Sequence, residues 1–341
     1  MIKMTEVNRN IAFDVARALG IILVVFGHAL RGLVSGGHVD PTGWSHSVDY
    51  FIYTFHMPLF FVVSGYFFRT GGGDTFASKI LWNLAYPYIL WTLIQGSVQI
   101  LLANSGSVNG SLTIADLSQI LWKPIGQFWF LYAMFFVQII AFLSRNHCKN
   151  LSATIMAFIG FLVSFFFLPG TFTLVFYGLA YFLLGIYFHD QNIFEKVRSS
   201  ASRVAILLAG GIAAAILCYK LGVPEKMPIA AALLLVPGLI GLCYALSGAI
   251  KGTILAKGLV LIGQSSMGIY ILHILTIGVV RIVLLRVFNV TDPFVLLTSL
   301  TVIAVLVPVA LQQVAVRLGI EKYLGLPSSA NPMRARPRVE T

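Results

Sequence analysis

Long blocks of apolar residues recur along the chain, and short polar segments separate them. Because a helix needs about 20 apolar residues to cross a bilayer, each block is long enough to span a membrane. Lipid offers no partners to backbone N–H and C=O groups, and the blocks are too uniformly apolar for a membrane barrel, so we interpret them as helices. The pattern predicts an all-α, polytopic integral membrane protein with about ten transmembrane helices. The predicted spans are residues 11–33, 50–68, 80–103, 128–144, 151–169, 171–188, 203–219, 229–249, 259–285 and 294–316.

The composition agrees with this interpretation and favours one folded domain. Hydrophobic residues make up 58% of the 341 residues and charged residues only 10%. No polar stretch is long enough to form a second domain, so we expect a single integral membrane domain over residues 1–326. Residues 327–341, PSSANPMRARPRVET, are rich in proline and arginine, and we expect them to form a disordered basic tail in the cytoplasm.

The formal net charge of +11 raises the question of a nucleic-acid partner. The positions of the basic residues favour another explanation, because most lie in segments that face the cytoplasm if the N-terminus is inside. This asymmetry predicts a cell inner membrane protein with both termini in the cytoplasm and no nucleic-acid partner. We expect the first span to remain as an uncleaved signal anchor. The basic residues of the predicted outer segments are Arg31, Lys123, Lys220, Lys226 and Arg286.

Neither the cysteines nor the histidines have the spacing of a metal site. Cys148 lies in a short inside loop, and Cys218 and Cys243 lie within predicted helices. The sequence contains no HxxxH or CxxC pattern. We expect the three cysteines to be structural and the protein to need no metal.

Three ionisable residues lie in residues 14–28 of the first apolar block, DVARALGIILVVFGH. At about 100° per residue, Asp14, Arg17 and His28 fall within about 60° of one another on the helix surface. Arg17 and His28 are separated by about 16 Å along the helix axis, with Arg17 nearer the cytoplasm. Ionisable residues inside a membrane usually face a bundle interior or a wet cavity, so this polar stripe indicates a functional site. In an alternative interpretation, Arg17 reaches the inner headgroups and Asp14 only pairs with it, which leaves His28 unexplained.

A second set of polar residues lies in the next span, FIYTFHMPLFFVVSGYFFR. His56 lies at a depth similar to that of His28, and Pro58 frees a backbone carbonyl one turn earlier. Ser64 permits close helix contact, and Arg69 emerges at the cytoplasmic end. The first two spans together therefore place arginines toward the cytoplasm and histidines toward the outside.

This arrangement suits the transfer of an acyl group from a phosphorylated donor. Guanidinium groups bind phosphate through forked hydrogen bonds, so Arg17 and Arg69 would hold a donor that enters from the cytoplasm. A histidine gains and loses a proton near neutral pH and would deprotonate an acceptor hydroxyl as general base. The absence of a nucleophile elbow or a Cys/His pair favours direct transfer without an acyl-enzyme. A proton-coupled transporter or flippase of saccharide intermediates uses the same residue types, and the residues alone leave both functions open.

Five segments, in this order, resemble the membrane acyltransferase-3 family, the ten-helix O-acyltransferases of bacterial glycans. They are FDVARALGIILVVFGH, FHMPLFFVVSGYFFR, KILWNLAYPYILW, FWFLYAMFFVQ and LIGQSSMGIYILHIL. The motif FHMPLFF is similar to the corresponding sequence in the subgroup of fucose 4-O-acetylases and nodulation-factor acetyltransferases. The resemblance covers nearly the whole membrane region. It implies acetyl-CoA as donor and a sugar hydroxyl as acceptor, on a glycan, an exopolysaccharide or a lipid-linked saccharide.

The resemblance also implies roles for individual residues. Arg17 and His28 correspond to the essential pair of the family, and the other matching positions would support them. Some relatives carry a second basic pair after the second span, whereas here Arg69 is followed by TGGGDTFAS, which leaves the phosphate clamp partly unassigned. We expect the sugar to enter the membrane fold itself or to arrive with a separate glycan-biosynthesis protein. The expected catalytic residues are His28, Asp14 and His56, and the expected donor-binding residues are Arg17, Arg69, Ser64 and His273, although His273 alone would favour a structural role.

Overall fold

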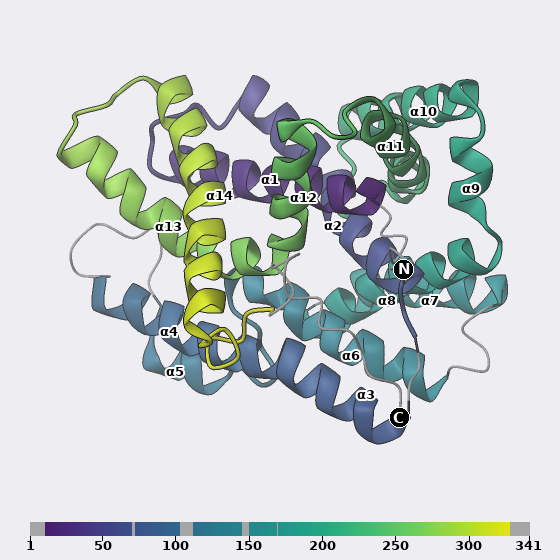
Figure 1. Ribbon diagram of the computed structural model, residues 1–341, viewed down its shortest axis with the longest axis horizontal. Coiled ribbons are helices and arrows are strands. Elements are labelled where there is room, and N and C mark those ends of the chain that lie inside the picture. The colour runs from purple at the N-terminus through teal and green to yellow at the C-terminus, as the bar shows by residue number, and fades with distance from the viewer. Residues whose placement is uncertain (1–10, 70–71, 103–111, 145–149, 169, 328–341) are drawn as a thin grey trace, which may run out of the picture.

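The computed structural model describes residues 11–69, 72–102, 112–144, 150–168 and 170–327. Within these residues all regular secondary structure is helical (Figure 1), which confirms the predicted all-α fold. Cys148 and residues 328–341 of the predicted tail lie outside the described residues.

The helices differ in length from single turns to 26 residues. A π-helical turn, Leu81–Ala85, joins α3 to α4, and a 3-10 turn, Gly126–Phe128, leads into α6. The α-helices are α1 (Ile11–Ser35), α2 (Trp44–Tyr66), α3 (Gly73–Ile80), α4 (Tyr86–Leu102), α5 (Ile114–Ser118), α6 (Trp129–Leu143), α7 (Leu151–Phe167), α8 (Thr171–Asp190), α9 (Ile193–Arg198), α10 (Ala201–Lys220), α11 (Ile229–Ala249), α12 (Ile254–Gln264), α13 (Ser266–Arg286) and α14 (Pro293–Leu318).

Seven helical segments of the described chain are long and apolar enough to cross a membrane, so the protein is a multi-pass membrane protein. They are α1, the segment Gly126–Leu143 that contains α6, α8, α10, α11, α13 and α14. Three further predicted spans are also helical. Of these, α4 and α7 are shorter, with 17 residues each, and α2 begins with the polar sequence WSHSVD.

The helix predicted over residues 259–285 is broken in the structure. α12 ends at Gln264 and α13 begins at Ser266, and the two helices differ in their main neighbours, since α12 packs mainly against α1 and α13 mainly against α14 (Figure 1). Gly263 brings α12 against α1, because a Cβ at this position would lie 2.0 Å from the carbonyl oxygen of Asp14. The sequence GQSS at residues 263–266 interrupts the apolar run with a glycine and three polar residues, and the helix breaks there.

α1 lies at the centre of the helix bundle. It packs against α2, α11, α12, α13 and α14, and most of its residues are buried. The polar stripe of α1 is therefore surrounded by protein rather than by lipid, which is the setting that buried ionisable groups require.

α2 and α8 approach each other so closely that their backbones touch. A Cβ on Gly65 would lie 1.9 Å from the carbonyl oxygen of Phe182, and one on Gly185 would lie 2.1 Å from that of Val62. Small residues of this kind let membrane helices pack at short range. This contact holds α2, which carries His56, against the rest of the bundle.

Candidate active site

Two cavities open beside α1, one toward each end of its polar stripe. The Arg17 cavity has a volume of about 180 Å³, and the His28 cavity has a volume of about 380 Å³. Val24, Met57 and Tyr270 line both cavities. The two cavities are therefore back to back, and these three side chains form the wall between them.

Arg17 lines its cavity from α1 and is partly exposed, with 31% of its side chain accessible. Its Nη1 donates to Oδ1 of the buried Asp14 at 3.3 Å, and its guanidinium carbon lies 5.3 Å from the ring centre of Phe67. Ser64 lines the same cavity from α2. The ion pair and the ring hold the guanidinium at the cavity, where a fork-shaped cation suits a phosphate-bearing ligand.

Arg69, the second arginine predicted to bind the donor, is not among the residues that line the Arg17 cavity. It is exposed, and its Nη1 donates to the carbonyl oxygens of Tyr66 and Phe68 at 3.4 and 2.9 Å. Its Nη2 lies 2.9 Å from Nε2 of His189 on α8. The structure thus brings Arg17, Asp14 and Ser64 together and holds Arg69 against the end of α8.

His273 lies beside His28 rather than beside Arg17, and the ring centroids of the two histidines are 5.0 Å apart. Nδ1 of His273 lies 2.7 Å from the carbonyl oxygen of Tyr270 and 3.1 Å from that of Ile269. Because a carbonyl only accepts, Nδ1 carries the proton and Nε2 keeps its lone pair. Within the described chain, this buried Nε2 has no hydrogen-bond partner. It is therefore available to accept an N–H from a neighbouring group such as His28.

His56 is also fixed by its own helix. Its Nδ1 donates to the carbonyl oxygen of Ile52 at 2.7 Å, and its ring packs edge-on against Tyr53 with centroids 4.5 Å apart. His56 and His273 are almost completely buried, at 1% and 0% exposure, whereas His28 is partly exposed. Both His28 and His56 line the His28 cavity, and His28 has the better access to a ligand there.

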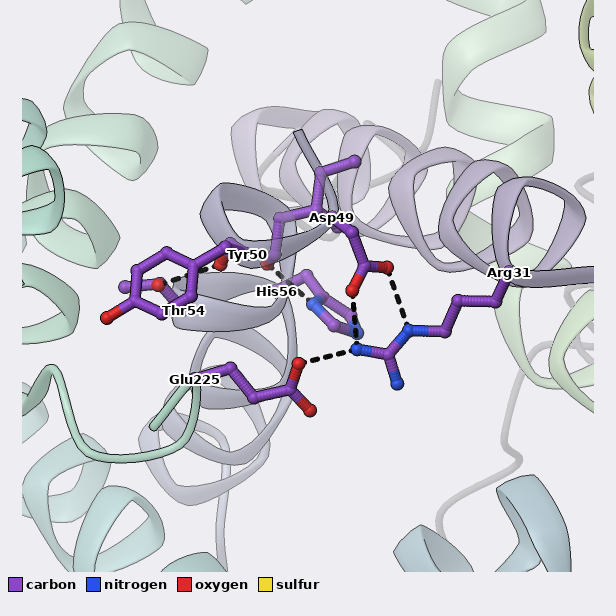
Figure 2. A network of polar contacts seen from close by, with 7 residues as sticks. Arg31, Asp49, Tyr50, Thr54, His56 and Glu225 are labelled. Carbon is purple, nitrogen blue, oxygen red and sulfur yellow. Dashed lines mark hydrogen bonds and ion pairs between the residues drawn. The ribbon is translucent and has the colours of Figure 1, made fainter. Parts of the chain in front are cut away.

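Arg31 anchors a charged network at the wall of the His28 cavity (Figure 2). Its Nε and Nη2 donate to the two carboxylate oxygens of Asp49 at 2.8 and 2.7 Å, and Nη2 also donates to Glu225 at 2.6 Å. The guanidinium carbon lies 3.4 Å from the ring centre of Tyr53. This network ties α1 to α2 and to the loop before α11, and it fixes one side of the cavity.

The sequence interpretation missed Arg31 as a site residue and counted it only as an outer basic residue. The available signal was its spacing, because Arg31 follows His28 by three positions and so lies on the same face of α1. The polar stripe therefore continues past His28 to the end of the helix.

Gln95 of the His28 cavity was also missed. Gln95 on α4 and Gln127 before α6 form a reciprocal amide pair, with N···O distances of 3.2 and 2.7 Å. Both are buried and line the cavity together with Trp129, whose flat ring suits a sugar face. Paired amides, a carboxylate and an aromatic ring are suitable partners for a ligand with several hydroxyl groups. Neither glutamine belongs to a local motif, so only the fold reveals this pair.

Comparison with known proteins gives the same family as the sequence motifs. A protein-family profile described as an acyltransferase domain matches residues 10–312. The nodulation protein NolL of Mesorhizobium japonicum is 31% identical over 137 residues, which are 38% of this chain and 34% of that protein. The nodulation protein NolL of Sinorhizobium fredii is 30% identical over 224 residues, which are 62% of this chain and 57% of that protein. The matched region thus spans between a third and three fifths of the length of these relatives. No solved structure matches the chain.

Proposed function

This chain belongs to the family of membrane acyltransferases whose domain profile spans nearly its whole length, and on that premise we propose its reaction. The protein transfers an acetyl group from acetyl-CoA to a sugar hydroxyl of a glycan, an exopolysaccharide or a lipid-linked saccharide. The donor enters the Arg17 cavity, and the acceptor enters the His28 cavity.

The observation that carries this proposal is the wall shared by the two cavities. The two cavities share the lining residues Val24, Met57 and Tyr270. Only this one layer of side chains therefore separates the acyl group of the donor from the hydroxyl group of the acceptor. Arg17 at one end of the stripe suits the phosphates of acetyl-CoA, and Ser64 lies beside it. His28 at the other end suits an acid–base role.

In the proposed reaction, His28 accepts the proton of the acceptor hydroxyl while the hydroxyl oxygen attacks the thioester carbonyl carbon. A carbon–oxygen bond forms and the carbon–sulfur bond breaks. The proton on His28 then passes to the departing sulfur, which leaves as the thiol of CoA. For this step the ring of His28 turns its N–H toward Nε2 of His273, whose ring centroid lies 5.0 Å away, and Asp14 keeps Arg17 oriented at the donor end.

The basic residues of the predicted inner segments support an inner-membrane location with the Arg17 cavity toward the cytoplasm. The donor would then be drawn from the cytoplasm and the acceptor would be reached from the outer half of the membrane. A separate glycan-biosynthesis protein would supply or receive the saccharide.

The test is transfer of label from radiolabelled acetyl-CoA in membranes that contain the wild type, His28→Ala or His46→Ala. His46 serves as the matched control, because it is an exposed histidine of α2 that contacts Tyr219 and does not line the His28 cavity. We expect label in a glycolipid or polysaccharide fraction with the wild type and His46→Ala, and none with His28→Ala. Absence of label in every fraction, with folded protein and native acceptors present, would favour the transporter.

A further inference from the structure

A third cavity adjoins the His28 cavity. This Lys123 cavity has a volume of about 460 Å³ and lies between the segment before α6, the end of α7 and the first turn of α8. Lys226 lines both the Lys123 cavity and the His28 cavity, so a ligand in one lies next to a ligand in the other. Lys123 and Lys226 are the charged side chains of its described lining, and both are positive.

The carboxylates close to these lysines are already engaged elsewhere. Glu225, the neighbour of Lys226 in the sequence, accepts a hydrogen bond from Arg31 at 2.6 Å. Asp116 interacts with Lys123 through space, without an ion pair. Its carboxylate accepts hydrogen bonds from the backbone N–H and the hydroxyl of Thr113 in a capping box. Within the described chain, no ion pair joins either lysine to a carboxylate. Glu225 and Asp116 therefore act on these lysines only through space, and both ammonium groups keep the capacity to pair directly with an anion.

Lys226 is partly shielded from water. Its Nζ lies 5.5 Å from the ring centre of Trp129, and burial lowers the pKa of its ammonium group. The same lining includes Thr171, the first residue of α8, and its N-cap Gly170, which contributes no side-chain cap; the positive end of the helix dipole favours an anion at this position. An anionic group in the cavity would interact favourably with both lysines and with the start of α8.

Several large aromatic residues next in sequence to the lining of the Lys123 cavity are exposed. Phe166 and Phe167 at the end of α7 and Phe172 in α8 are 65%, 76% and 64% exposed, and Trp122 is 59% exposed. Tryptophan is enriched where a membrane protein meets the headgroups, and exposed phenylalanines offer apolar surface to lipid chains. A ligand that joins an anionic group to a hydrocarbon chain fits a basic cavity with such residues beside it.

We propose that the Lys123 cavity binds the phosphate group of a lipid-linked saccharide, and that this saccharide is the acceptor. The phosphate lies between Lys123 and Lys226, the lipid chain extends over the exposed phenylalanines, and the sugar reaches the His28 cavity past Lys226. The position of the sugar rests on the proposed acyltransferase function, whereas the phosphate site does not. The acceptor class is therefore set by a basic site outside the cavity in which the reaction takes place.

Binding of radiolabelled farnesyl diphosphate to the purified protein in lipid nanodiscs tests the site without any acetyl transfer. Excess CoA is present throughout, so that the Arg17 cavity does not bind the probe. The variants are Lys123→Gln/Lys226→Gln and the control Lys220→Gln, which changes an exposed lysine of α10 outside the cavity. The thermal midpoint of unfolding of each variant shows that it is folded.

We expect the double variant to bind farnesyl diphosphate at least about tenfold more weakly than the wild type, because charge-assisted hydrogen bonds are lost. The Lys220→Gln variant should stay within about twofold of the wild type. Equal affinity in the wild type and the double variant would overturn the site. Inorganic diphosphate that binds as tightly as farnesyl diphosphate would overturn the lipid-linked acceptor. Lysine-dependent binding in a protein that transfers no acetyl group would support this site and count against the proposed function.

Discussion

His273 of α13 lies beside His28 of α1, with ring centroids 5.0 Å apart and with its Nε2 left without a hydrogen-bond partner in the described chain. Two carbonyl oxygens of its own helix fix the proton on Nδ1. In the proposed reaction, the lone pair on Nε2 would accept an N–H of His28 once that ring turns toward it, and the other nitrogen of His28 would act as the base. His273 would then be a positioning residue and His28 the group that contacts the acceptor.

Replacing His273 tests this relationship. We expect His273→Phe to lower kcat by on the order of 100-fold, because the base loses its orientation, while the Kd for acetyl-CoA stays the same. His273→Gln places an amide oxygen near the position of Nε2 and should recover part of the activity. Steady-state kinetics over a range of pH would measure both, and equal kcat values for the two variants would argue against positioning through Nε2.

Arg17 should bind the donor through its fork rather than through its charge alone. Arg17→Lys keeps the positive charge but loses the paired donors, and we expect the Kd for acetyl-CoA to rise about tenfold. Arg69→Lys, which changes an exposed arginine outside the Arg17 cavity, is the matched comparison and should have a smaller effect. Titration of the purified variants with acetyl-CoA measures this difference, and unchanged affinity in Arg17→Lys would remove Arg17 from the donor site.

Met57 forms part of the wall between the two cavities, so a larger side chain there should block their connection. We expect Met57→Trp to abolish transfer while acetyl-CoA still binds, because Arg17, which holds the phosphates, is unchanged in this variant. Met57→Leu, which nearly conserves the volume, should retain activity. If Met57→Trp transferred acetyl groups at the wild-type rate, the acyl group would not pass this wall.

Gly185 should be essential for the contact between α2 and α8. A Cβ at this position would lie 2.1 Å from the carbonyl oxygen of Val62, so we expect Gly185→Ala to cost about 1–3 kcal/mol of stability. Gly248→Ala is the control, because nothing lies within 4 Å of a Cβ at Gly248. Thermal unfolding in detergent compares the two, and similar midpoints would show that α2 and α8 separate easily.

The sequence predicted the helical membrane fold and the residues that α1 contributes to the candidate site. Helical periodicity placed Asp14, Arg17 and His28 on one face of α1, because spacing within one helix is a local property. The pairing of His28 with His273 and that of Gln95 with Gln127 depend on how distant helices pack, and neither has a local signal. The break at Ser265 was missed for a related reason, since hydropathy measures how apolar a segment is and not the direction in which it runs.

The most direct test of the account uses sealed vesicles that contain the purified protein in one orientation. Radiolabelled acetyl-CoA is supplied on the side of the Arg17 cavity, and the acceptor fraction identified by labelling is supplied on the opposite side. We predict that label reaches the acceptor, that the CoA thiol stays on the donor side, and that His28→Ala abolishes both. Transfer that requires donor and acceptor on the same side, or that continues in His28→Ala, would contradict the account.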